Sequence, residues 1–164
     1  MDPELKKALG MAMGYLSRRE RSIREMDDYL IKKGFTDLVG KKVIERLKQE
    51  NYLDDKRFAR IYLENRKRNK PKSIFALRYE LVHKGIKSSI IDPLLAEYND
   101  VELAFLAVKP KIRSWKHMKR ESRKKKMLNY LRYRGFDFFV CQSTWERIFP
   151  SDSELYPYES DPME

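Results

Sequence analysis

The feature that most constrains the fold is a motif that occurs three times along the chain. The three copies align without gaps and are Ser22–Phe35, Ser73–Ile86 and Arg123–Phe136, so that successive copies start 51 and 50 residues apart. In each copy the fifth residue is apolar, a Leu follows four residues later, and a Gly follows four residues after that. These positions are Met26, Leu30 and Gly34, then Leu77, Leu81 and Gly85, then Met127, Leu131 and Gly135. Self-similarity at such a period is typical of repeat proteins.

The spacing within each copy predicts a short helix that ends at the Gly. Apolar residues four positions apart lie on one face of a helix. A Gly readily adopts the left-handed conformation that terminates a helix, and the Phe or Ile after it then packs beneath the helix. Ser22 and Glu25 form a capping-box pattern at the start of the first copy, with Ser17 and Glu20 as a competing one.

Further helical patterns flank each copy, so the predicted fold is all-α, with three tandem three-helix repeats. A unit of about 50 residues has only a marginal core of its own, and each repeat should therefore pack on its neighbours. This predicts an elongated, curved modular protein. The expected organisation is repeat 1 over residues 1–53, repeat 2 over 54–99, repeat 3 over 100–149, and an acidic, flexible C-terminal tail over 150–164.

The charge is high and unevenly distributed. The chain carries 36 basic and 25 acidic residues, a net charge of +11. Residues 109–134 hold twelve Lys or Arg against the single acid Glu121, whereas residues 150–164 hold five acids and no Lys or Arg. A solvated surface explains most charge runs, but a field of this strength favours contact with a polyanion or an acidic protein.

The residues with reactive side chains do not form a catalytic or metal-binding pattern. Cys141, His83 and His117 are too few and too scattered for a zinc cluster. Cys141 is expected to be a small buried hydrophobe. The segment Gly34–Lys42 resembles a phosphate-binding loop, but its glycines are spaced wrongly and Lys42 stands where Ser or Thr is needed. We therefore expect no enzyme activity, no cofactor and no metal.

No stretch of the chain is apolar enough to cross a membrane. The longest run without a charge, Ala8–Ser17, is far shorter than the roughly 20 residues that a spanning helix needs. The first residues lack the pattern of a secretion signal. The expected location is the cytoplasm.

Aromatic residues interleave with basic ones in the third copy, which is typical of proteins that stack bases of single-stranded nucleic acids. The alternative is that these aromatics belong to the core. The repeat favours the core for Phe136, and Tyr130 can be a core residue that reaches the surface. Tyr133 and Trp115 are compatible with either interpretation.

Several stretches at these distances resemble the RecX family, the bacterial regulators of the RecA recombinase. The matching stretches are YLSRRERS from Tyr15, KGF from Lys33, YLDDKRFAR from Tyr52, ELVHKGI from Glu80 and LRYRGF from Leu131. The chain departs from the family pattern at Asn69-Lys70-Pro71, where many relatives place a Gly before the Pro. It also departs in the long basic link between Val108 and Arg123 and in the acidic tail.

The resemblance implies a curved helical-repeat protein that acts as a monomer. Such a protein lodges in the groove of the RecA–single-stranded DNA filament. It blocks filament extension and thereby inhibits ATP hydrolysis, strand exchange and repressor co-cleavage, which places it in DNA repair and the SOS response. The alternative is a helical repeat protein that binds single-stranded DNA or RNA directly, weakly and in a salt-dependent manner, without a recombinase partner.

The hypothesised contacts to RecA or DNA are basic positions expected to be exposed. They are Arg18, Arg19, Arg21, Lys32, Lys33, Arg66, Lys67, Arg68, Lys84, Lys124, Lys125, Arg132 and Arg134. No motif assigns any of them to the protein rather than to the nucleic acid.

Overall fold

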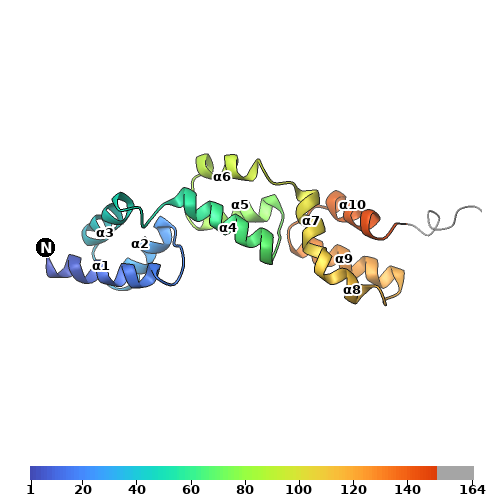
Figure 1. Ribbon diagram of the computed structural model, residues 1–164, viewed down its shortest axis with the longest axis horizontal. Helices are drawn as coiled ribbons and strands as arrows, with labels where there is room; N and C mark the ends of the chain where they lie inside the picture. The colour runs from blue at the N-terminus through green and yellow to red at the C-terminus, as the bar shows by residue number, and fades with distance from the viewer. Residues whose placement is uncertain (151–164) are drawn as a thin grey trace, which may run out of the picture. The chain divides into compact units, whose positions relative to one another are not determined.

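The computed structural model describes residues 1–150, and within this range the chain is helical with no strand (Figure 1). Apart from Pro150, the predicted acidic tail lies outside the described residues. The elements are α1 (Pro3–Leu16), α2 (Ile23–Lys32), α3 (Asp37–Gln49), α4 (Asp55–Asn69), α5 (Ile74–His83), α6 (Ser88–Leu95), α7 (Asp100–Val108), the 3₁₀ turn η1 (Lys109–Lys111), α8 (Ile112–Trp115), α9 (Arg120–Tyr133) and α10 (Phe138–Ile148). The all-α class and the tandem helical repeat are confirmed.

Side-chain caps fix where many of the helices begin. Ser22 and Glu25 form a complete capping box at the start of α2, so the competing cap at Ser17 is not used there. Asp54 accepts the backbone N–H of Arg57 at 3.1 Å and begins α4. The same kind of cap stands before α1, α3, α7 and α10, at Asp2, Thr36, Asn99 and Asp137. Each cap satisfies a backbone donor that the first turn of a helix leaves without a partner.

The three glycines of the repeat end their helices in the same way. Gly34, Gly85 and Gly135 have φ of 90°, 80° and 90°, the left-handed region that suits glycine. In every case the glycine N–H donates to the carbonyl three residues back, and the next N–H donates to the Leu carbonyl five residues back. This paired bonding is the Schellman motif. Asn51 ends α3 with the same bonds at φ 62°.

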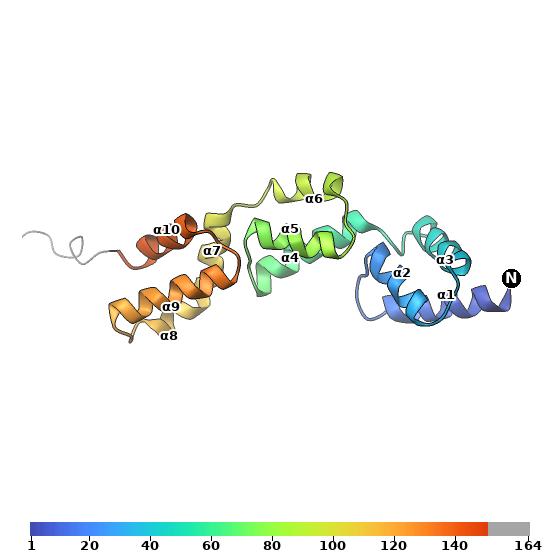
Figure 2. The same ribbon diagram turned by 180° about the vertical axis from the view of Figure 1, so that it is seen from behind.

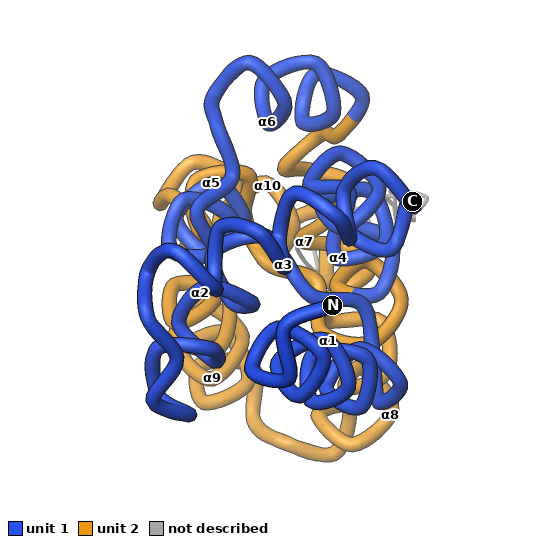
Figure 3. Tube along the Cα trace, turned by 90° about the vertical axis from the view of Figure 1, so that its left-hand side faces the viewer, with its two compact units in different colours: residues 1–65, 77–97 blue, residues 66–76, 98–164 orange. Residues whose placement is uncertain are grey.

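The chain divides into two compact units (Figure 3). Unit 1 comprises residues 1–65 and 77–97, and unit 2 comprises residues 66–76 together with the chain from 98 onward. In unit 1, helices α1, α2 and α3 lie together (Figure 1), and Met26, Leu30 and Val43 are almost wholly buried in the core that they enclose. In unit 2, α10 packs against α9 and α7 (Figure 2), and Met127, Leu131 and Trp145 are buried there.

One contact joins repeats 1 and 2 inside unit 1 and recurs between repeats 2 and 3 inside unit 2. The first N–H of α2, on Ile23, donates to the carboxylate of Asp55 in α4 at 2.9 Å. The first N–H of α5, on Ile74, donates to the carboxylate of Asp100 in α7 at 2.8 Å. An acid in the first turn of one repeat therefore satisfies the open helix end of the preceding repeat.

The repeat glycines lie at the same two contacts. A Cβ on Gly85 would stand 2.6 Å from the Cβ of Arg24, and one on Gly135 would stand 2.6 Å from the Oγ of Ser73 and 3.0 Å from the Cβ of Ala76. A Cβ on Gly34 would meet nothing within 4 Å. The two later glycines thus permit close packing of repeats in addition to ending helices.

Two local features were not evident from the spacing. Helix α6 begins at Ser88 and encloses Pro93 in its interior. The link between Val108 and Arg123 is not a plain loop, because it contains η1 and α8. None of the helices within residues 1–150 has the length and apolar character that a membrane crossing requires.

Candidate interaction surfaces

The basic residues between α1 and α2 have different roles. Arg18 is exposed, as expected. The expectation that Arg21 is exposed is wrong, because its side chain is only 8% exposed. The guanidinium of Arg21 lies 3.8 Å from the centroid of the Tyr15 ring and donates to the Tyr15 carbonyl at 3.3 Å. Arg21 therefore holds the turn between the helices and is not available to a partner.

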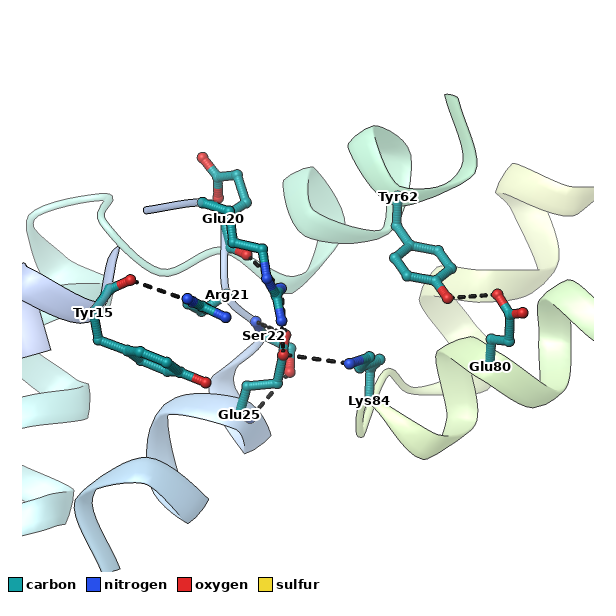
Figure 4. A network of polar contacts seen from close by, with 9 residues as sticks. Tyr15, Glu20, Arg21, Ser22, Glu25, Tyr62, Glu80 and Lys84 are labelled. Carbon is teal, nitrogen blue, oxygen red and sulfur yellow. Dashed lines mark hydrogen bonds and ion pairs between the residues drawn. The ribbon is translucent and has the colours of Figure 1, made fainter. Parts of the chain in front are cut away.

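Glu25 pairs with two of the predicted contact residues, and one of them, Lys84, comes from repeat 2 (Figure 4). Its carboxylate forms an ion pair with Arg19 and lies 3.3 Å from the Lys84 ammonium. Burial alone raises the pKa of Glu25. The hydrogen bond from Arg19, the backbone donor on Ser22 and the charge of Lys84 outweigh it, so the pKa lies below the ordinary value. Hydrogen bonding to Glu25 also raises the pKa of Arg19.

A second polar link stabilises the middle of unit 1, where the Tyr62 hydroxyl donates to the Glu80 carboxylate and joins α4 to α5 (Figure 4).

At the end of α2, Lys32 and Lys33 are exposed, and the Lys33 ammonium lies 5.6 Å from the Tyr29 ring centroid. These two lysines remain accessible. Arg19 instead pairs with Glu25 within repeat 1, and Lys84 joins repeat 2 to the same carboxylate.

The last turn of α4 presents the second predicted group of cations. Lys67 and Arg68 are exposed, whereas Arg66 is partly buried. The Lys67 ammonium lies 5.6 Å from the centroid of the Tyr98 ring, within unit 2. Positive charge in the last turn also suits the negative end of the helix dipole.

The predicted cations of repeat 3 divide into a surface group and a structural one. Lys124, Lys125 and Arg132 line one groove between α9 and α10, and Arg132 and Lys125 are exposed. Arg134 donates to the carbonyl of Pro71 at 3.3 Å and lies 4.4 Å over the Tyr130 ring. Arg134 thus ties repeat 3 to the segment before α5.

The structure shows which of the aromatic residues in repeat 3 are buried in the core and which are exposed. Trp115 is buried and packs edge-on against Tyr130 at 5.5 Å, so it belongs to the core, as does Phe136. Tyr133 is 94% exposed at the end of α9. An aromatic ring so exposed contributes little to folding, which leaves it available for stacking on a partner.

Several surface residues were missed by sequence reasoning. Phe138 and Phe139 are exposed at the start of α10. Neighbours on a helix point about 100° apart, a signal that both could not face the same interior. Arg120 and Arg123 stack over Trp145, at 5.1 and 5.8 Å.

The described residues contain one cysteine, and its environment disfavours the thiolate. Cys141 is buried, and burial raises the pKa of its thiol, which disfavours the reactive thiolate. Within residues 1–150 no group of His, Cys, Asp and Glu side chains gathers as a metal site would require. The described surface carries exposed cations, exposed aromatic rings and a groove with an apolar lining.

Comparison with known proteins places these features in a family. The family model "RecX, first three-helix domain" matches residues 8–47, and "RecX, second three-helix domain" matches residues 54–95. The regulatory protein RecX of Prosthecochloris aestuarii is 38% identical over 147 residues, which cover 90% of this chain and 97% of that protein. The chain belongs to the RecX family.

Other RecX proteins match at similar length. The regulatory protein RecX of Chlorobium limicola is 33% identical and is covered to 96%. The crystal structure of RecX from Lactobacillus salivarius superposes with a TM-score of 0.72 at 20% identity, over 90% of this chain and 98% of that one. At this identity the structural likeness concerns the fold. The RecX fold thus includes the third repeat, which lies beyond the two matched domains.

Proposed function

We propose that the chain is a negative regulator of RecA that binds in the groove of the RecA–single-stranded DNA filament. There it blocks filament extension and lowers the ATPase, strand-exchange and co-protease activities. The observation that carries this proposal is the 38% identity to a regulatory protein RecX over nearly the whole of both chains. We also propose that it acts as a monomer in the cytoplasm, in recombination, DNA repair and the SOS response, and that its repeats span residues 1–53, 54–99 and 100–149.

The distribution of exposed cations supports this function. Lys32 and Lys33 in repeat 1, Lys67 and Arg68 in repeat 2, and Lys125 and Arg132 in repeat 3 are exposed. Every repeat therefore offers positive charge to a phosphate-bearing filament. Many modest contacts in separate modules add up to tight binding when one ligand spans them all.

The direct test is the DNA-dependent ATPase of the cognate recombinase. Substoichiometric amounts of this chain should depress it, because one blocked filament end affects many subunits. A double charge reversal, Lys67→Glu with Arg68→Glu, should weaken inhibition. The matched reversal Lys41→Glu with Lys42→Glu, on exposed positions of α3 outside the predicted contact set, should not. An unchanged ATPase at a molar excess of the parent chain contradicts the proposal.

A second candidate is direct binding of single-stranded DNA or RNA, which the exposure of Tyr133 favours. Aromatic rings on a basic surface stack bases without sequence preference. Tight binding to bare DNA at physiological salt would favour this candidate. Feeble binding there, together with strong binding to the assembled filament, would favour the filament regulator.

A further inference from the structure

The groove between α9 and α10 combines an apolar floor with a cationic rim. Leu128, Phe138 and Cys141 supply the apolar lining, and Lys124, Lys125 and Arg132 supply positive charge. Its volume is about 350 Å³, at the lower end of the range found for ligand pockets. Phe138 is 70% exposed, so the core of unit 2 does not account for this ring. Glu121 also lines the groove, which leaves an excess of positive charge.

The described chain ends beside this groove. Arg120, at the start of α9, donates to the carbonyls of Phe149 and Pro150 at 3.2 and 3.3 Å. Pro150 lines a second hollow of about 300 Å³, and Lys124 lines both this hollow and the groove. Pro150, to which residue 151 is bonded, therefore lies beside the groove within the same unit.

The sequence that follows has the complementary chemistry. Residues 151–164 read SDSELYPYESDPME, with five acids, no Lys or Arg, and the large apolar or aromatic residues Leu155, Tyr156 and Tyr158. Fourteen residues can extend to about 45 Å. Helix α9 is about 21 Å long, so the segment can reach any part of the groove.

We propose that residues 151–164 dock in the α9–α10 groove of their own chain. Their aromatic or aliphatic side chains cover Phe138 and Leu128, and their carboxylates face Lys124, Lys125 and Arg132. Attachment at Pro150 gives the segment a high effective concentration at the groove, so a weak intrinsic contact suffices. The inference concerns an intramolecular contact and does not rest on the proposed function.

The test compares backbone amide NMR signals of the full chain with those of the chain ending at Pro150. Signals of Leu128, Asn129 and Phe138 should differ between the two at every protein concentration. A synthetic peptide of residues 151–164, added to the shortened chain, should move the same signals toward their positions in the full chain. Raising the ionic strength should weaken this binding.

Matched variants separate docking from general charge attraction. Lys124→Glu with Lys125→Glu should weaken the peptide about tenfold, and Phe138→Ser should also weaken it. Lys41→Glu with Lys42→Glu should not weaken it, and neither should Phe139→Ser, since none of these three residues lines the groove. Circular dichroism checks that each variant remains folded.

Three outcomes would overturn the proposal. Identical groove signals in the full and shortened chains would mean that the segment lies elsewhere. Differences that vanish on dilution would identify a second copy as the occupant. Equal binding by a peptide of scrambled sequence, with equal losses in the control variants, would reduce the effect to unspecific electrostatics.

Discussion

The backbone N–H of Ile23 donates to the Asp55 carboxylate across the boundary between two repeats, and Ile74 and Asp100 repeat this bond one boundary later. Each N–H belongs to the open end of a helix and has no partner inside it. The pair therefore fixes where one repeat attaches to the next. The same N–H to carboxylate bond occurs at both boundaries between repeats, so we regard it as the regular way in which adjacent repeats of this chain are joined.

Removal of these carboxylates should loosen both boundaries. Asp55→Ala and Asp100→Ala should each destabilise the protein by about 1–2 kcal/mol, because a partly buried N–H loses its acceptor. The loss of unfolding free energy in Asp55→Ala is measured by urea unfolding followed by circular dichroism. The loss in Asp100→Ala is measured by urea unfolding followed by the fluorescence of Trp115 and Trp145, both buried in unit 2. Exposed Glu45→Ala is the control. A loss no larger than that of the control would contradict this role of the carboxylates.

Two acids in unit 1 should respond to pH in opposite directions. The pKa of Glu25 is lowered from 4.5, so its stabilising contribution is complete above 4.5 and is lost as pH falls through the folded value. Burial raises the pKa of Asp55 from 3.8, since the donor on Ile23 compensates only in part. Its contribution is therefore most favourable below 3.8 and declines as pH rises through the folded value.

Unfolding free energies of Glu25→Gln and Asp55→Asn, relative to the parent, should reveal this difference. The unfolding free energy of Glu25→Gln should lie below that of the parent at about pH 7, and this difference should shrink as the pH falls to about 3. Asp55→Asn should gain relative to the parent as the pH rises through the same interval, because the amide keeps an acceptor for Ile23 without a desolvated charge. Parallel pH profiles for the two variants would contradict the assignment.

The glycines provide an internally controlled series. Gly34, Gly85 and Gly135 share positive φ, so alanine adds a similar backbone strain of about 1–2 kcal/mol at each. Only Gly85→Ala and Gly135→Ala also push a Cβ against atoms that cannot easily retreat, the Cβ of Arg24 and of Ala76. These two should lose about 1–3 kcal/mol more than Gly34→Ala in urea unfolding. Equal losses at all three positions would mean that the close packing is not stabilising.

The features that the sequence predicts well are local ones. The glycine stops, the capping box at Ser22 and the buried Met26 and Leu30 depend on residues within one helix and its ends, and short-range spacing records them. The capping box also shows how one residue changes a boundary. Ala76 replaces the capping glutamate in repeat 2, and Ser73 then donates its backbone N–H to the Arg134 carbonyl at 3.1 Å.

The features that the sequence predicts poorly depend on contacts between distant residues. Arg21 is a cation in a basic run, and contacts with the ring and the carbonyl of Tyr15 hold it inward. Trp115 lies among lysines, yet it is buried because Tyr130 stands beside it on α9. A sequence shows what kind of residue stands at each position, but it does not show which distant residue buries it.

Tyr133 provides the clearest test of base stacking. Tyr133→Ala should weaken binding of single-stranded DNA roughly tenfold or more, as expected for the loss of one stacked base. The dependence on salt should stay the same, since no charge is removed. The ring is 94% exposed, so stability should not change. Phe75→Ala, at another exposed aromatic position of unit 2, is the control. A reduced salt slope with unchanged affinity would exclude stacking.

Deletion of residues 151–164 should increase the affinity for single-stranded DNA at low salt. The deletion removes five acids and no Lys or Arg, which raises the net charge from +11 to +16. It also frees the cations of the α9–α10 groove if the segment docks there. The gain should disappear toward about 1 M salt, where the Debye length falls to about 3 Å.

A full-length variant with the five acids replaced by Asn and Gln separates the loss of charge from the opening of the groove. It should reproduce the gain in affinity if charge alone acts, and only part of it if the aromatic side chains still occupy the groove. No gain in affinity for either variant would show that the segment does not screen the basic surface.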